Sequence, residues 1–351
     1  MRQTTKYAAV IAAAALALTA CGGDSDTTTD PVDTATNGGE ATSDVSVGIA
    51  FDTGGRGDQS FNAAAAAGLD QAKAEFGIEA AEATASDGEA QSAREERLLQ
   101  LIEAGNDTII AVGFNYAAAI DAVAPDYPEV HFALIDSTDA TGDNVANLTF
   151  AEEQGSFLVG AAAALKSRSD HIGYVGGVQV PLIEKFQAGF DAGAKEINPD
   201  IQIETTYLTQ PPDFSGFGDP AKGKTAAEGM FQAGADVVYH ASGFSGGGVF
   251  SAAQEANKWA IGVDSDQALT AAEEVRDVIL TSMIKKVDVA VYEFLSDQVA
   301  GNFAAGERIF DLEADGVDYS TTGGRIDDIV GQLDELKAKI ISGEIEVPTT
   351  P

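Results

Sequence analysis

The most constraining feature of this sequence is a regular alternation of strand-type and helix-type segments. Apolar runs of strand type occur in a first series at 45–51, 78–83, 107–112 and 130–135, and in a second at 172–175, 201–207, 236–240 and 259–263. Helix-type segments separate them, at 62–76, 92–104, 116–124, 152–165, 181–196, 220–233 and 247–257. Strands that alternate with helices form parallel sheets with helices on both faces. The two series therefore predict an α/β protein with two doubly wound lobes.

The length of the folded part agrees with two lobes. Residues 45–347 make roughly 300 residues, which exceeds the size at which a single hydrophobic core stops growing. We expect the chain to cross between the lobes near Phe150, near Leu280 and near residue 305, so that these crossings form a hinge. The first lobe then contains 45–150 and about 281–304, and the second contains 151–280 and about 305–347. The last stretch supplies a segment at Ile309–Val317 and a helix at Ile326–Ile341.

The N-terminus has the composition of a secretory signal. Arg2 and Lys6 precede an apolar run at 8–18, which is shorter than the roughly 20 residues that span a bilayer. The only cysteine, Cys21, follows small residues and resembles the acylated cysteine of a bacterial lipobox. We expect a signal peptide at 1–20 and a lipidated Cys21; the alternative is a stray cysteine beside an ordinary cleavage site.

Residues 21–44 follow with almost no apolar side chain and many Gly, Thr, Asp and Ser residues. Such a segment buries too little surface to offset its ordering entropy, which predicts a flexible tether. The chain has 20 basic and 56 acidic residues, a net charge of −36. This excess of acidic residues argues against nucleic-acid binding, which requires a basic surface.

Three aspartates follow strand-type runs, where ligands bind in open α/β sheets. Asp52, Asp136 and Asp264 each come directly after such a run, and two lie in the first series. Each alone is also a common turn or helix-capping residue. Together they favour a cleft whose carboxylates accept hydrogen bonds from a hydroxyl-bearing solute. Lys285 is the candidate counter-cation, or else a surface lysine that begins the next helix.

Residues 218–225 match the pattern of a phosphate-binding loop, G-x-x-x-x-G-K-[ST]. Residues 209–217 separate this segment from the preceding strand, whereas a phosphate loop joins its strand directly. Pro220 fits better as the first residue of a helix that Asp219 caps. The three histidines are scattered, and no pair has metal-ligand spacing. We therefore expect no enzyme activity, no cofactor and no metal.

Several short motifs carry a resemblance to a known family. They are 52–62 (DTGGRGDQSFN), 172–177 (IGYVGG), 186–190, 218–220, 234–237, 261–264 and 281–285. In this order and spacing they resemble the basic membrane protein family, lipoproteins that include the purine nucleoside receptors of bacterial ABC importers. The resemblance implies a type I periplasmic-binding-protein-like fold, with two lobes joined by a hinge.

The resemblance also implies roles for individual residues. Phe61 and Phe217 fall where two aromatic rings enclose the base, although each could instead be a packing residue. The sugar-binding positions are Asp52, Asp264 and Lys285, with backbone near Gly243. Asp136 and Ser60 fall where the base edge is recognised, and Ser60 replaces an amide side chain there.

These observations predict a lipid-anchored, extracytoplasmic solute-binding protein that captures a nucleoside, with a purine nucleoside expected, for an ABC permease. We expect a monomer that is held at the cell membrane through Cys21. The alternative is the same fold with another small solute, such as a sugar, a nucleobase or an autoinducer.

Overall fold

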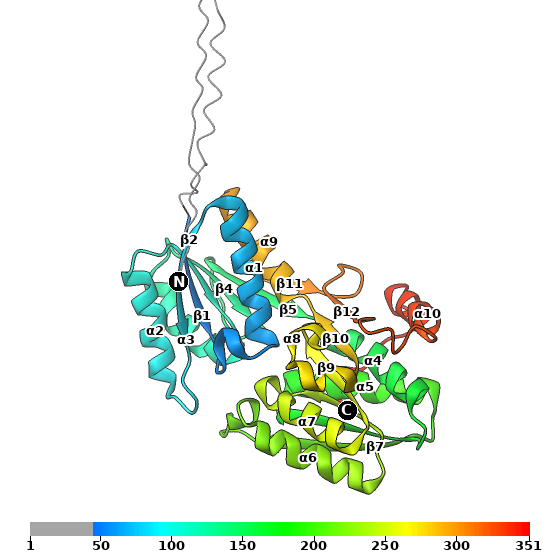
Figure 1. Ribbon diagram of the computed structural model, residues 1–351. Helices are drawn as coiled ribbons and strands as arrows, with labels where there is room; N and C mark the ends of the chain where they lie inside the picture. The colour runs from blue at the N-terminus through cyan, green and yellow to red at the C-terminus, as the bar shows by residue number, and fades with distance from the viewer. Residues whose placement is uncertain (1–44) are drawn as a thin grey trace, which may run out of the picture. The chain divides into compact units, whose positions relative to one another are not determined.

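The computed structural model describes residues 45–351. The predicted signal peptide, Cys21 and the tether lie outside the described residues. The described part contains two six-stranded sheets (Figure 1). We call each sheet with its helices a lobe, the first lobe being the one that contains the strand directly after residue 45.

The sheet of the first lobe is entirely parallel, with the strand order β11-β5-β4-β3-β1-β2. Its strands are β1 (Ser46–Phe51), β2 (Glu79–Thr84), β3 (Thr108–Ala111), β4 (His131–Ile135), β5 (Val145–Phe150) and β11 (Gly306–Phe310). The sheet of the second lobe has the order β12-β10-β9-β8-β6-β7, and only β12 runs antiparallel to its neighbour. Its strands are β6 (His171–Val178), β7 (Gln202–Thr209), β8 (Val237–Ala241), β9 (Trp259–Asp264), β10 (Ile279–Lys285) and β12 (Val317–Tyr319).

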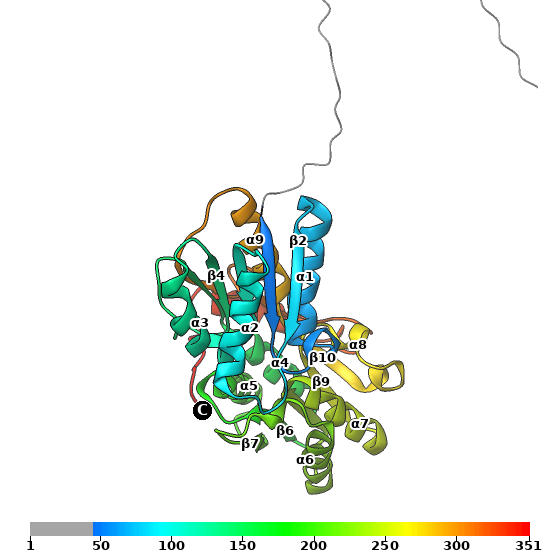
Figure 2. The same ribbon diagram turned by 90° about the vertical axis from the view of Figure 1, so that its left-hand side faces the viewer.

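Helices cover both faces of each sheet, as Figures 1 and 2 show. In the first lobe these are α1 (Phe61–Phe76), α2 (Gln91–Glu103), α3 (Ala117–Val123) and α9 (Val287–Val299). The alternating side chains of β3 explain the two layers: Ile109 packs with the core under α2 and α3, whereas Ile110 packs with the core under α1. Strands buried on both faces read as continuous apolar runs, which is why the sequence reveals them.

The second lobe has the same layering. Its helices are α4 (Glu152–Lys166), α5 (Pro181–Ile197), α6 (Pro220–Ala233), α7 (Gly246–Ala256), α8 (Gln267–Thr270) and α10 (Val330–Ile341). Helices α4 and α5 pack closely at Gly189, which has no Cβ. A Cβ at this position would lie only 2.1 Å from the carbonyl oxygen of Glu153. The prediction that Asp219 caps a helix beginning at Pro220 is confirmed, since its carboxylate accepts from the amides of Ala221 and Lys222.

The sheets divide the chain differently from the predicted division at two points. Residues 281–285 belong to β10 in the second sheet, and β11 joins the first sheet by parallel pairing with β5. The expected crossings near Leu280 and residue 305 were therefore placed several residues too early. The reason is that β11 is a short edge strand in which only Phe310 is buried, so it carries no apolar signal. Strand β5 was not predicted either.

The three crossing segments contact one another. The Ala151 amide donates to the carbonyl oxygen of Phe310 at 3.1 Å, and the Lys286 amide donates to Gly316 at 2.9 Å. The crossings are thus joined by backbone hydrogen bonds, which places the start of α4 beside the end of β10. Among the helices of residues 45–351, none is long and apolar enough to cross a membrane.

Candidate ligand-binding cleft

A cavity lies where the carboxyl ends of strands from both sheets meet. Seven of the eight predicted ligand-binding residues line it: Asp52, Phe61, Asp136, Phe217, Gly243, Asp264 and Lys285. Asp52 follows β1, Asp136 follows β4, and Asp264 ends β9. The position agrees with the rule that ligands of open α/β sheets bind beyond the carboxyl ends of the strands.

Two of these aspartates have unusual backbone conformations. Asp136 has φ 71° and Asp264 has φ 63°, both in the left-handed region that non-glycine residues seldom adopt. Asp is one of the few residues that tolerate this region, at an energetic cost. The conformation turns each side chain away from the direction that a continuing strand would give it. Strain of this kind is concentrated at binding sites, which supports a functional role for both residues.

Lys285 is the cation of the cleft. Its side chain is 1% exposed, so the alternative of a surface lysine is wrong. The ammonium lies 2.6 Å from Asp136 Oδ2 and 3.1 Å from Glu152 Oε1, the latter at the start of α4. It also lies 5.0 Å from the ring centroids of Phe61 and Phe150. Two carboxylates and the faces of aromatic rings thus compensate for the loss of water around the charge.

Burial dominates the protonation of the cleft carboxylates. Burial raises the pKa of Asp136 to about 7, although the nearby charge of Lys285 opposes the shift. Burial likewise raises the pKa of Asp264 to about 6 against the charge of Lys285. Burial alone would lower the pKa of Lys285, but the carboxylates, Asp136 foremost, raise it above its ordinary value. The cleft therefore holds more carboxylates than its single buried lysine neutralises.

One oxygen of Asp136 has no partner. Oδ2 accepts from Lys285, whereas Oδ1 is buried and accepts no hydrogen bond. A buried acceptor without a donor costs about 1–3 kcal/mol. A solute that donates an N–H or O–H to Oδ1 would recover this energy. Asp136 is thus suited to recognising a hydrogen-bond donor of a bound molecule.

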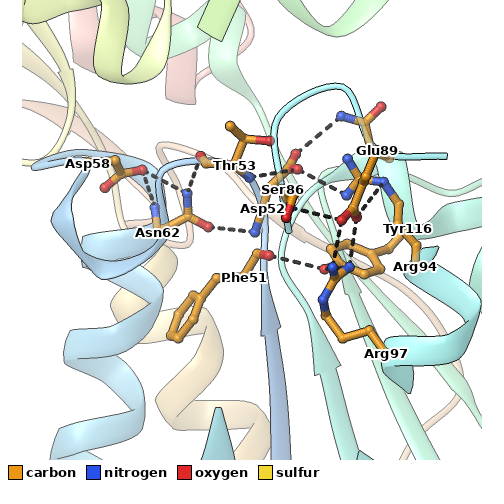
Figure 3. A network of polar contacts seen from close by, with 11 residues as sticks. Phe51, Asp52, Thr53, Asp58, Asn62, Ser86, Glu89, Arg94, Arg97 and Tyr116 are labelled. Carbon is orange, nitrogen blue, oxygen red and sulfur yellow. Dashed lines mark hydrogen bonds and ion pairs between the residues drawn. The ribbon is translucent and has the colours of Figure 1, made fainter. Parts of the chain in front are cut away.

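Asp52 is held by the first lobe (Figure 3). Its amide donates to Asn62 Oδ1 at 2.9 Å, and its carboxylate accepts from Thr53, Arg94 and Asn115. Gly113 makes room for it, because a Cβ at this residue would lie 2.9 Å from Asp52 Oδ2. The side chain is 16% exposed and borders the cavity. This carboxylate is fixed in place before any solute arrives.

The loop before α1 is organised by Asp58. Its carboxylate accepts from the amides of Ser60 at 3.0 Å, Asn62 at 2.8 Å and Ala63 at 3.0 Å, so it caps the helix. Asn62 also donates its side-chain amide to Asp58 at 2.9 Å (Figure 3). Asp58 and Asn62 both line the cavity, and neither was predicted from the sequence. The signal that could have found them is their D-x-x-x-N spacing where the loop after β1 leads into α1.

Ser60 has a different location from the one predicted. It is fully buried and does not line the cavity. Its hydroxyl donates to Asp264 Oδ2 at 2.5 Å, and its carbonyl accepts from Ser265 Oγ at 3.1 Å. The neighbouring Gln59 carbonyl accepts from Gln267 and Thr270 of α8. Residues 59–60 of the first lobe therefore hold the second lobe through its β9–α8 segment, and we call these two residues the clamp.

The aromatic residues of the cleft come from both lobes. Phe61 begins α1, and Phe217 ends a short 3-10 helix, η4 (Ser215–Phe217). Gly177 makes room for Phe217, because a Cβ there would lie 2.5 Å from its ring. Phe114 of the first lobe meets the Phe217 ring edge-on at a centroid distance of 6.4 Å. Phe114 and Phe186 also line the cavity and were not predicted.

Two other features of the sequence, the phosphate-loop pattern and His240, lie outside the lining of the cavity. Lys224, the lysine of the phosphate-loop pattern, pairs with Glu255 at 2.7 Å on the surface of the second lobe. His240 is fully buried, and burial lowers its pKa to about 4. Within residues 45–351, no group of three His, Cys, Asp or Glu side chains could hold a metal ion. The cavity is lined by aromatic faces, carboxylates and the ammonium of Lys285.

Two sheet-based lobes with a polar and aromatic cleft between them define a solute-binding protein. The chain belongs to the ABC transporter substrate-binding protein PnrA-like family, whose model matches residues 45–351. A CD4+ T-cell-stimulating antigen of Listeria innocua is 35% identical over 97% of this chain and 97% of its own length. An ABC transporter nucleoside-binding protein of Lactococcus lactis is 32% identical over 89% of this chain and 91% of its own length.

A solved structure gives the same result for the fold. An ABC transporter solute-binding protein from Aeropyrum pernix K1 superimposes with a TM-score of 0.76 at 32% identity, over 87% of this chain and 93% of that chain. The predicted family and the predicted two-lobed fold are thereby confirmed. The roles predicted for individual cleft residues stay predictions.

Proposed function

We propose that this protein is an extracytoplasmic receptor that captures a purine nucleoside between its lobes and delivers it to an ABC permease. The observation that carries the proposal is the composition of the cavity. It combines the rings of Phe61 and Phe217 with the carboxylates of Asp52, Asp136 and Asp264. A purine nucleoside has both hydroxyl groups and a flat aromatic ring that can stack between two phenylalanines, whereas a simple sugar has no such ring. The relative from Lactococcus lactis is named a nucleoside-binding protein.

In this proposal, one set of cleft residues binds the base and another set binds the ribose. The rings of Phe61 and Phe217 stack on the base, an interaction that contributes roughly 1–3 kcal/mol per contact. Asp136 Oδ1, which has no partner, accepts from the base edge. Asp52, Asp264 and Lys285 bind the ribose, with the backbone at Gly243 alongside. Charge-assisted hydrogen bonds of this kind are stronger than neutral ones.

The Ser60 side chain has a different role from recognition of the base. Because its hydroxyl is directed at Asp264 Oδ2, we propose that it joins the lobes rather than contacting the solute. The receptor then closes around a hinge at the three crossings, and the closed form is the one that the permease recognises. We propose that the protein acts as a monomer and performs no catalysis.

We further propose that lipid at Cys21 anchors the receptor to the outer face of the cell membrane. Mass spectrometry of the mature protein should find an acylated N-terminal Cys21. A Cys21→Ala protein should be released or left unprocessed. An unmodified N-terminus elsewhere in the native protein would contradict the anchor.

The solute itself is tested by a thermal-shift screen against purine and pyrimidine nucleosides, free bases and pentoses. We expect purine nucleosides to raise the melting temperature most. A shift with pentoses alone would favour a sugar receptor of the same fold, and a shift with free bases alone would favour a nucleobase receptor. Either result would contradict the proposal.

A further inference from the structure

Arg94 is a buried arginine that contacts a cleft residue without lining the cavity. It lies on α2, and its side chain is 9% exposed. Its Nη1 donates to Asp52 Oδ1 at 3.1 Å (Figure 3). Arginine is seldom buried unless its charge is paired. Because Arg94 contacts Asp52 but does not line the cavity, we expect its task to concern this carboxylate rather than the solute.

The hydrogen bonds of Asp52 are divided unequally between its two oxygens. Oδ1 accepts two, from the Thr53 amide at 2.9 Å and from Arg94. Oδ2 accepts one, from Asn115 Nδ2 at 3.2 Å. An ionised carboxylate has about four acceptor positions, two on each oxygen. Asp52 Oδ2 therefore keeps one position for a donor from the cavity, while Oδ1 is fully engaged.

Arg94 is itself held in one orientation. Its guanidinium lies 5.0 Å from the centroid of the Tyr116 ring and 3.6 Å from Glu89 Oε1. Glu89 is fixed in turn by two bonds from Arg97, at 2.7 and 2.6 Å, and by the Ser86 amide (Figure 3). A planar guanidinium stacked on a ring loses little further freedom when it forms a hydrogen bond. The network thus presents Arg94 to Asp52 in a fixed geometry.

We propose that Arg94 is a positioning residue that directs Asp52 so that Oδ2 accepts one hydroxyl of the bound nucleoside. The inference rests on the proposed function for the identity of the solute. It adds that Asp52 recognises a single ribose hydroxyl through the oxygen that Arg94 leaves open. Without Arg94, the carboxylate is free to turn, and this recognition is lost.

The test compares Arg94→Gln with Arg56→Gln. Arg56 likewise pairs with two carboxylates of the first lobe, Asp70 at 2.8 Å and Glu82 at 2.6 Å, but has no bond to Asp52. Calorimetry with inosine should show about tenfold weaker binding for Arg94→Gln, which is about 1.4 kcal/mol. Arg56→Gln should stay within about twofold of wild type. Equal losses in the two variants would overturn the inference.

Deoxynucleosides separate positioning from a general structural effect. One of the 2′-, 3′- and 5′-deoxy forms of inosine should bind wild type and Arg94→Gln with the same affinity. This analogue lacks the hydroxyl that donates its hydrogen bond to Asp52. The other two should lose affinity as inosine does. If Arg94→Gln weakens all three analogues and the free base equally, its effect is only structural and the inference is wrong.

A crystal structure of the Arg94→Gln protein without solute gives a reading that is independent of the nucleoside. We expect the Asp52 carboxylate to leave the Thr53 amide. If Asp52 keeps its bonds to Thr53 and Asn115, the inference is overturned even where nucleosides bind. If wild type binds no nucleoside, the proposed function fails, and this structure still decides whether Arg94 positions Asp52.

Discussion

The raised pKa of Asp136 predicts that nucleoside binding depends on pH near neutrality. Burial raises this pKa to about 7 in the free protein, and the unpartnered Oδ1 faces the cavity. A solute that donates a hydrogen bond to Oδ1 binds the ionised form and lowers the pKa in the complex. Binding then releases a proton, so affinity must increase as pH rises through 7 and decrease as pH falls.

The magnitude follows from the ionised fraction of Asp136. With a pKa of about 7, about nine-tenths of the free protein is ionised at pH 8 and about one-tenth at pH 6. If the complex stays ionised over this range, the titration of Asp136 alone makes the affinity about tenfold higher at pH 8, a difference of about 1.4 kcal/mol. At pH 7 binding should release about half a proton.

Isothermal titration calorimetry with inosine measures both quantities. Titrations at pH 6, 7 and 8 give the affinity, and paired buffers with different ionisation enthalpies give the proton release. Asp136→Asn keeps the shape but cannot titrate, so its affinity should be nearly flat between pH 7 and 8. A flat wild-type profile, or uptake of a proton on binding, would refute the assignment of Oδ1 as an acceptor for the solute.

Three further predictions concern separate parts of the molecule. Asp264→Ala should weaken nucleoside binding by about 2–4 kcal/mol and leave free-base binding nearly unchanged, measured by calorimetry; equal losses would mean that Asp264 does not face the ribose. Ser60→Ala removes the clamp bond to Asp264 and should increase the radius of gyration in small-angle scattering of the solute-free protein, whereas an unchanged radius would contradict a clamp. His240 has its pKa lowered from 6.5 to about 4 by burial, so the neutral form is favoured in the folded state. Its stabilising effect should be complete above pH 6.5 and disappear as pH falls towards 4, up to about 3 kcal/mol. Urea unfolding measures this: between pH 6.5 and pH 4 the free energy of unfolding of His240→Asn should fall by less than that of wild type. An equal fall in both proteins would mean that groups other than His240 cause the loss of stability in acid.

The sequence was sufficient for the two-lobed architecture because most strands are buried on both faces. Such strands form continuous apolar runs, as β3 and β6 do. It was insufficient at the edges and crossings. Strand β11 is exposed except at Phe310, and strand β5 contains Asn147 and Thr149, so neither has a clear periodic signal. Their places depend on pairing between segments that lie far apart in the chain.

The cleft residues likewise divide into those that the local sequence reveals and those that only the fold brings together. Asp52, Asp136 and Asp264 could be found because strand ends converge at one edge of each sheet. Glu152 and Arg94 could not, since each acts through a partner that only the fold brings near: Lys285 at 3.1 Å and Asp52 at 3.1 Å. Ser60 was predicted from the resemblance alone. A local sequence does not reveal that its hydroxyl is directed across the lobes to Asp264.

Calorimetry on wild type and Phe61→Ala tests whether a purine base stacks within the cleft. Inosine, adenosine and ribose are the three titrants, and Phe61→Trp is the matched control because it keeps an aromatic face. Wild type should bind the nucleosides and not ribose. Phe61→Ala should lose about ten- to a hundred-fold in nucleoside affinity, in line with roughly 1–3 kcal/mol per stacked contact, and Phe61→Trp should retain much of it. Ribose binding by wild type without nucleoside binding would show that no purine base stacks in the cleft.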